Sequence, residues 1–196
     1  SIQPNKTIPF RIPRMRALVN AIYPGTPLAI TEWKAAFAGE SDFSTALADA
    51  DAYGIMAREN VYVAERWTAP NPANPNYWAL KLYTDYDGLG DGFEYISVSD
   101  THNADPNLFS SYAAVGSLGP TSIMVINKDP QNSVQVQFTL KDFTPTSFTS
   151  YTLTSTYPTG IASNATNATG SSTAQPWSAT QYFPPYSITL LIINGS

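Results

Sequence analysis

The chain has 196 residues, of which 13% are charged and 43% hydrophobic, and its net charge is -5. This composition indicates a globular protein of one or two domains rather than a disordered acidic segment. Ten Lys and Arg stand against fifteen Asp and Glu without any basic run, which argues against nucleic acid as a partner. No apolar run reaches the roughly 20 residues that cross a bilayer, and residues 1 to 10 lack the layout of a signal peptide, so we expect no membrane partner. The absence of cysteine excludes thiol catalysis and thiolate metal sites.

The first 86 residues alternate helical periodicity with short apolar runs. The pattern predicts a helix over 12–23, a strand over 28–32, a helix capped by Asp42 or Ser44, a strand over 61–64 and a helix over about 77–86. This order is typical of parallel βα units. The first strand ends in Glu32 and Trp33, and the second runs into Glu65, Arg66 and Trp67. Carboxylates and aromatic rings are therefore predicted at the mouths of two neighbouring strands.

After Asp87 the apolar residues recur with period two, which predicts half-buried antiparallel strands. Strands are expected over 109–115, 123–126, 134–140, 148–153 and 188–193. The second and third of these are predicted to pair through the turn at 127–132, and residues 157–180 are predicted to form a loop rich in Gly, Ser, Thr and Asn. The result would be a β-sandwich, with a domain boundary in the glycine-rich run 87–92.

Five segments in fixed order resemble glycoside hydrolase family 44, whose members are retaining endo-β-1,4-glucanases. They are Ile30-Thr31-Glu32-Trp33, Ala48-Asp49-Ala50-Asp51 with Gly54-Ile55, Glu65-Arg66-Trp67-Thr68, Lys81-Leu82-Tyr83 with Tyr86-Asp87-Gly88, and Met124-Val125-Ile126-Asn127-Lys128. The resemblance runs from about Ile8 to Ile193 and corresponds to the C-terminal half of such an enzyme. It implies an α/β part followed by an all-β part. Residues 1–86 would form the last βα units, with strands seven and eight, of a (β/α)8 TIM barrel, and residues 87–196 an antiparallel β-sandwich domain.

The resemblance also implies roles for three side chains. Glu32 matches the catalytic nucleophile at the end of the seventh strand, and Trp67 matches an aromatic residue that faces the sugar. Trp33 stands where the family more often has Tyr, so a substrate-binding ring remains plausible there. The implied partner is a β-1,4-glucan chain, cellulose-like or xyloglucan. We expect no cofactor and no metal, and the low charge with many Pro, Tyr, Ser, Thr and Asn residues suits an extracellular polysaccharide enzyme.

A retaining glycosidase needs a second, protonated carboxyl about 5 to 5.5 Å from the nucleophile. In this family the acid follows the fourth strand in an Asn-Glu pair, and the sequence contains no such pair. A whole barrel takes about 250 residues, whereas residues 1–86 supply two strands. We therefore expect the chain to be a fragment that lacks the N-terminal barrel strands one to six with the general acid, and to be inactive when isolated.

Each of these residues also has a structural interpretation. Glu32 could be a buried acid paired with Arg14 or Arg16, and the two tryptophans could be core residues. Glu65 is expected to pair with Arg66 or another cation rather than to serve as the acid. Trp78 and Trp177 are expected to be packing residues.

Two further groups are interpreted as non-functional. The run of Asp85, Asp87 and Asp91 fails the spacing of a calcium loop and is predicted to form turns, and His102 is predicted to lie on the surface. The N-glycosylation motif Asn-x-Ser/Thr occurs at Asn5, Asn164, Asn167 and Asn194. In a chain rich in Asn and Thr, such matches also arise by chance.

The alternative function is a non-catalytic carbohydrate-binding or structural β-sandwich module, in which the barrel segment is a remnant. A third possibility is another retaining barrel-plus-sandwich family with a different linkage preference.

Overall fold

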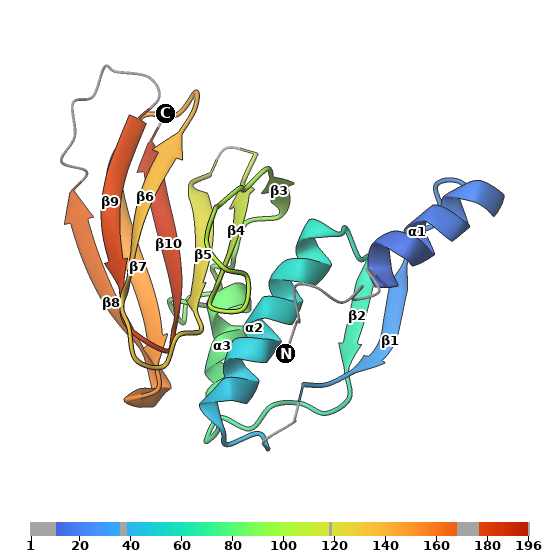
Figure 1. Ribbon diagram of the computed structural model, residues 1–196, viewed down its shortest axis with the longest axis horizontal. Helices are drawn as coiled ribbons and strands as arrows, with labels where there is room; N and C mark the ends of the chain where they lie inside the picture. Colours follow the sequence, from blue (N-terminus) through green and yellow to red (C-terminus); the bar gives the residue numbers. More distant parts are fainter. Residues whose placement is uncertain (1–10, 36–38, 118, 168–176, 196) are drawn as a thin grey trace.

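The computed structural model describes residues 11–35, 39–117, 119–167 and 177–195. Among the described elements, the helices α2 and α3 lie between a parallel strand pair and a large antiparallel sheet, and the helix α1 lies beside that pair (Figure 1). The elements are α1 (Arg11–Ile22), β1 (Ala29–Trp33), α2 (Phe43–Arg58), β2 (Val63–Arg66), α3 (Pro75–Thr84), β3 (Ile96–Val98), β4 (Phe109–Val115), β5 (Thr121–Asn127), β6 (Val134–Leu140), β7 (Pro145–Thr154), β8 (Tyr157–Asn167), β9 (Trp177–Phe183) and β10 (Ser187–Gly195). The predicted order helix, strand, helix, strand, helix in the first part is confirmed.

The start of α2 follows from its cap. Asp42 has an extended backbone, and its Oδ1 accepts hydrogen bonds from the Ser44 N–H at 2.8 Å and the Ser44 hydroxyl at 2.6 Å. This satisfies one of the free N–H groups that every helix leaves at its first turn. Asp42 is therefore the capping residue of the two that the sequence offered.

The strands form three sheets. A six-stranded sheet has the order β3-β4-β5-β10-β7-β8, and β6 pairs only with β9 in a separate two-stranded ribbon. β1 and β2 form a parallel pair. The predicted pairing of β5 with β6 is wrong, since β5 lies between β4 and β10. Every residue of β5 is buried, as suits a central strand, while the alternating pattern of β6 suits a ribbon with one face exposed.

The predicted loop over 157–180 is also wrong in part. β8 occupies residues 157–167 at the edge of the large sheet, and β9 begins at Trp177. Residues 168–176 lie outside the described part of the chain. Threonine favours strands, and an edge strand tolerates a polar, exposed face, which composition alone does not separate from a loop.

One core fills the space between the six-stranded sheet and the β6-β9 ribbon. Phe138, Trp177 and Phe183 of the ribbon meet sheet residues including Phe148 and Ile193. The rings of Phe148 and Trp177 stack with centroids 5.1 Å apart. The prediction that Trp177 is a packing residue is confirmed.

A second core lies on the opposite face of the same sheet and is shared with α2 and α3. Leu47 and Leu82 of the helices pack there with the sheet residues Met124, Ile126 and Leu190. The Cβ that Gly54 lacks would lie 2.2 Å from the ring of Tyr112 on β4, so the glycine allows the helix to approach the sheet closely. Apolar packing thus crosses the predicted domain boundary at 87–92, and the division into 1–86 and 87–196 stays a prediction.

The helix α1 has the predicted residues at helical spacing but none of its side chains is buried. Leu18 is 61% exposed, and Met15 and Ile22 are exposed as well. Among the described elements, none covers the face of β1 and β2 that turns away from α2 (Figure 1), and neither strand has a buried residue. Parallel sheets are normally covered on both faces. The combination of helices with mostly strand structure is confirmed, while a place for β1 and β2 in a barrel stays a prediction.

Candidate active site

The parallel pairing of β1 and β2 brings their carboxyl ends together. Trp33 is the register partner of Arg66, and a bulge lies between Ile30 and Trp33. One residue beyond β2, the backbone N–H of Trp67 donates to the carbonyl oxygen of Trp33 at 2.9 Å. The backbones of Trp33 and Trp67 are therefore joined directly at the ends of the two strands.

Side chains on a strand alternate between its two faces. Trp33 and Arg66 turn toward α2, where the ring of Trp33 lies 5.1 Å from that of Tyr53 and Arg66 reaches Asp49. Glu65 therefore lies on the opposite face of β2, and Glu32 lies in the bulge of β1 that is opposite Glu65; both glutamates are exposed. Trp67 is 62% exposed. The predicted nucleophile and the predicted sugar-facing ring thus sit, open to solvent, at the same edge of the strand pair.

The contacts of Trp33 favour the packing interpretation that the sequence left open for it. Its ring meets Tyr53 edge-on, and its Nε1 is buried without a hydrogen-bond partner among the described residues. A substrate on the open face of the strands would meet Glu32 and Trp67 before it could reach this ring.

Arg66 is the centre of a charged network on the α2 side. Its Nη2 lies 3.2 Å from Asp49 Oδ2 and 3.4 Å from Glu40 Oε1, and Lys34 Nζ lies 2.8 Å from the same Glu40 oxygen. The hydrogen bond from Lys34 lowers the pKa of Glu40. Burial raises the pKa of Asp49 more than the neighbouring guanidinium of Arg66 lowers it.

The predicted pair of Glu65 with Arg66 is wrong, and the alternative pair of Glu32 with Arg14 or Arg16 is not found among the described residues. Arg66 pairs with Asp49 and Glu40 rather than with Glu65, because alternation points it and Glu65 to opposite faces. Arg16 does not reach Glu32 but donates to the backbone carbonyl oxygens of Glu59 and Asn60 at 2.9 and 2.8 Å. Within the described ranges, Glu32 and Glu65 make no ion pair.

The network residues Lys34, Glu40 and Asp49 were not predicted as part of the site. The sequence carried one signal, because Asp49 interrupts the run of small and apolar residues with which α2 faces its neighbours. An aspartate there must be buried and therefore needs a partner. The identity of that partner depended on which strand lies over the helix.

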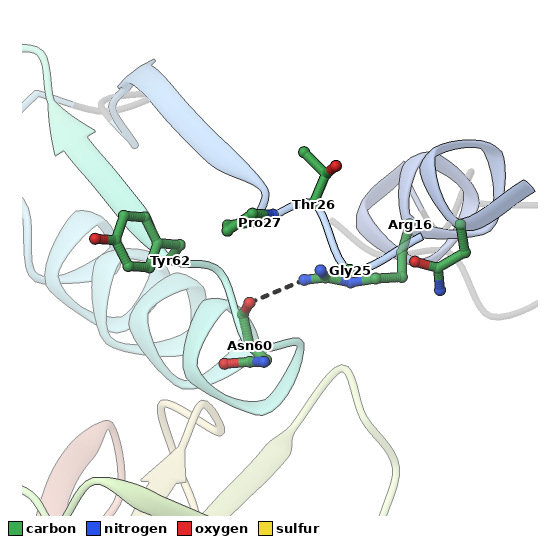
Figure 2. A pocket seen from close by; sticks show the side chains of 7 residues that line it. Arg16, Gly25, Thr26, Pro27, Asn60 and Tyr62 are labelled. Atoms are coloured by element: carbon green, nitrogen blue, oxygen red, sulfur yellow. Dashed lines mark hydrogen bonds between the residues drawn. The ribbon is translucent and has the colours of Figure 1, made fainter. Parts of the chain in front are cut away.

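A small cavity lies at the other end of the strand pair. It measures about 270 Å³ and is lined by residues before β1 and β2, including Thr26, Pro27 and Tyr62, with Arg16 of α1 reaching in (Figure 2). In (β/α)8 barrels chemistry sits at the carboxyl ends of the strands, and the amino ends serve stability. This cavity is thus separate from Glu32 and Trp67.

The acidic run after α3 forms turns, as predicted. Asp85 Oδ1 accepts from the Gly90 N–H at 2.9 Å, Asp87 Oδ1 accepts from the Leu89 N–H at 2.8 Å, and the other oxygen of Asp85 pairs with Lys81. His102 is exposed, also as predicted, and its ring lies edge-on to that of Phe109. None of the described helices is long and apolar enough to span a membrane.

The proteins of known function that resemble this chain include several glucanases. No family model matches the chain. The chain is 34% identical over 131 residues to endoglucanase A of Paenibacillus lautus, covering 66% of this chain and 18% of that protein. A crystal structure of a bifunctional glucanase-xylanase from a metagenome library superposes with a TM-score of 0.86 at 33% identity, over 99% of this chain and 37% of that one. A family 44 endoglucanase from Clostridium acetobutylicum superposes with a TM-score of 0.78 at 28% identity, over 93% of this chain and 35% of the other. The predicted relationship to glycoside hydrolase family 44 is confirmed.

The chain spans about a third of each of these two solved structures and less than a fifth of the curated relative from Paenibacillus lautus. A family 51 α-L-arabinofuranosidase from Thermotoga petrophila also superposes, with a TM-score of 0.65 at 13% identity, and shares the fold alone. The family 44 relationship therefore extends over nearly all of this chain, but this chain matches only part of a family 44 enzyme.

Proposed function

We propose that this chain supplies the nucleophile to a retaining glycoside hydrolase that cleaves β-1,4-glucan chains of the cellulose or xyloglucan type. Glu32 is the nucleophile and Trp67 is the ring on which a sugar unit stacks. The general acid comes from barrel strands one to six, in an N-terminal part of the same enzyme, and the enzyme acts outside the cell. Support comes from relatives named as endoglucanase, glucanase-xylanase and xyloglucanase.

One observation carries this proposal. Glu32 and Trp67 lie at the carboxyl ends of adjacent parallel strands, and both are exposed. Active sites of (β/α)8 enzymes occupy that end of the strands. A sugar offers flat C–H faces to an indole, which places its anomeric carbon near a neighbouring carboxylate.

The chemistry assigned to Glu32 is attack on the anomeric carbon. Its carboxylate oxygen forms a covalent bond to that carbon while the glycosidic oxygen leaves with a proton from the acid, and water then releases the sugar. Glu65 lies on the same face of the next strand, but no cation in the described part of the chain holds it. We assign it no step in this reaction.

The test compares Glu32→Ala with Glu65→Ala in a polypeptide in which the barrel is complete. We expect Glu32→Ala to abolish hydrolysis of xyloglucan and carboxymethylcellulose, and azide to restore glycosyl transfer by taking the place of the missing carboxylate. Glu65→Ala should retain most of the turnover. Full turnover by Glu32→Ala would remove Glu32 as nucleophile, and loss of turnover in Glu65→Ala together with loss of the alkaline limb of the pH–rate profile would move the acid to Glu65.

The alternative, a sandwich module with a remnant barrel segment, is less well supported. It requires the sheet to fold without α2 and α3, yet these helices bury Met124, Ile126 and Leu190 on one face of it. A different linkage preference within the retaining hydrolases fits the same placement of Glu32 and would appear as a different preferred polysaccharide in the same assay.

A further inference from the structure

We propose that Arg66, held in place by Asp49, is a positioning residue that fixes the indole of Trp67 beside Glu32. The inference rests on the proposed function, in which Trp67 receives the sugar. It gives a role to the buried guanidinium of Arg66, which takes no part in the proposed reaction.

Arg66 closes a short loop around Trp67. Its Nη1 donates to the carbonyl oxygen of Thr68 at 2.5 Å. Arg66 precedes Trp67 and Thr68 follows it, so this hydrogen bond spans Trp67. The N–H of Trp67 is itself bound to the carbonyl oxygen of Trp33. The backbone on both sides of Trp67 is thus fixed, although its ring is exposed.

The same network fixes the segment that follows Glu32. Lys34 lies directly after β1, pairs with Glu40 and donates from Nζ to Thr68 Oγ1 at 3.3 Å. Glu40 also receives Arg66. The segments that leave β1 and β2 are therefore joined through charged side chains as well as through the backbone hydrogen bond of Trp67.

The anchor of the network is costly to bury, which points to position rather than stability as its use. Asp49 is 0% exposed and the side chain of Arg66 is 8% exposed. Asp49 Oδ1 and Arg66 Nε have no hydrogen-bond partner among the described residues, and burial raises the pKa of Asp49 despite the guanidinium. Buried ion pairs often add little to stability compared with apolar residues, while they do fix geometry.

The helix α2 offers a matched control two residues away. Asp51 is also mostly buried and also holds a cation, with its Oδ2 2.9 Å from Lys128 Nζ, but it turns toward the sheet. Asp49→Ala removes the buried carboxylate from Arg66, which keeps Glu40, and Asp51→Ala removes the carboxylate that Lys128 binds. Only Asp49 is connected to Trp67.

The experiment uses the whole 196-residue chain labelled with 5-fluorotryptophan, with Trp67→Phe assigning the resonance of Trp67 among the four tryptophans. Fluorine NMR spectra are compared for the wild type, Asp49→Ala and Asp51→Ala. We expect Asp49→Ala to shift and broaden the Trp67 resonance, because its backbone gains alternative conformations, and Asp51→Ala to leave that resonance unchanged. An unchanged resonance in Asp49→Ala, or an equal change in both variants, would overturn the proposal.

A second variant covers the case in which Asp49→Ala does not fold. Arg66→Lys keeps the positive charge but cannot bind Asp49 and the carbonyl of Thr68 together, since a lysine lacks the planar fork. It should change the Trp67 resonance in the same way, and an unchanged resonance would count against the proposal. The NMR samples contain no sugar, so the spectra test the positioning role of Arg66 separately from the hydrolysis assay that tests Glu32.

Discussion

The backbone N–H of Trp67 donates a hydrogen bond to the carbonyl oxygen of Trp33 at 2.9 Å, yet the two indoles have opposite surroundings. Trp33 packs on Tyr53 of α2, whereas Trp67 is 62% exposed. One hydrogen bond thus joins a residue of the helix-facing layer to a residue of the open face. Substitutions at the two positions should separate packing from binding.

Trp33→Ala should lower the free energy of unfolding by about 1 to 3 kcal/mol, because it removes a half-buried ring from the contact with α2. Trp67→Ala should change it by less than about 0.5 kcal/mol, because an exposed ring contributes little packing. Urea unfolding of the two variants beside the wild type measures both. The reverse order of effects would show that Trp67 is the packing residue and would weaken its assignment to the sugar.

Gly54→Ala should destabilise the chain, although alanine is the better helix former. Helix propensity alone predicts a gain of about 1 kcal/mol. The added Cβ would meet the ring of Tyr112 at 2.2 Å, and overpacking of this kind costs about 1 to 3 kcal/mol. Ala57→Gly on the exposed side of α2 measures the propensity effect alone. A more stable Gly54→Ala variant would mean that helix and sheet can separate at no cost.

A polypeptide of residues 87–196 should not fold cooperatively by itself. Without α2 and α3, the face of the sheet that carries Met124, Ile126 and Leu190 is open to water. A large exposed apolar face should bind a hydrophobic dye and promote association. The matched control begins at residue 28 and lacks α1, which has no buried side chain, so its thermal unfolding should stay close to that of the whole chain. A cooperative transition of 87–196 would favour the independent sandwich module.

Stability should fall above about pH 10, where tyrosines in an unfolded chain begin to ionise. Burial raises the pKa of Tyr112 and of Tyr83 well above the ordinary value, so the folded state keeps these protons when the unfolded state has lost them. The contribution is therefore complete below pH 10 and is lost as the pH rises toward the folded-state pKa, by about 1.4 kcal/mol per pH unit for each such group. Urea unfolding between pH 8 and 11 should show a shallower slope for Tyr112→Phe than for the wild type. Tyr182→Phe, at an exposed position, serves as the control and should keep the wild-type slope. Equal slopes for Tyr112→Phe and the wild type would contradict the burial of this hydroxyl.

The sequence by itself determined the kinds of elements and the strand edge at which the candidate site is proposed. Hydrophobic periodicity located α1, α2, α3 and most strands, because spacing of 3.6 or 2 along the chain is a local property. It also placed Glu32 at the end of one strand and Trp67 at the end of the next, and the parallel pairing then brought them to one edge.

The partners of those elements were decided only by the tertiary structure. Local pattern does not say that β5 pairs with β4 and β10 rather than with β6, or that Ser- and Thr-rich residues form the edge strand β8. It does not say that Arg66 turns toward Asp49 instead of Glu65, because the choice depends on which face of β2 meets α2. Strand order and side-chain partners are set by contacts between residues far apart in the chain, where packing over a whole face outweighs any local preference.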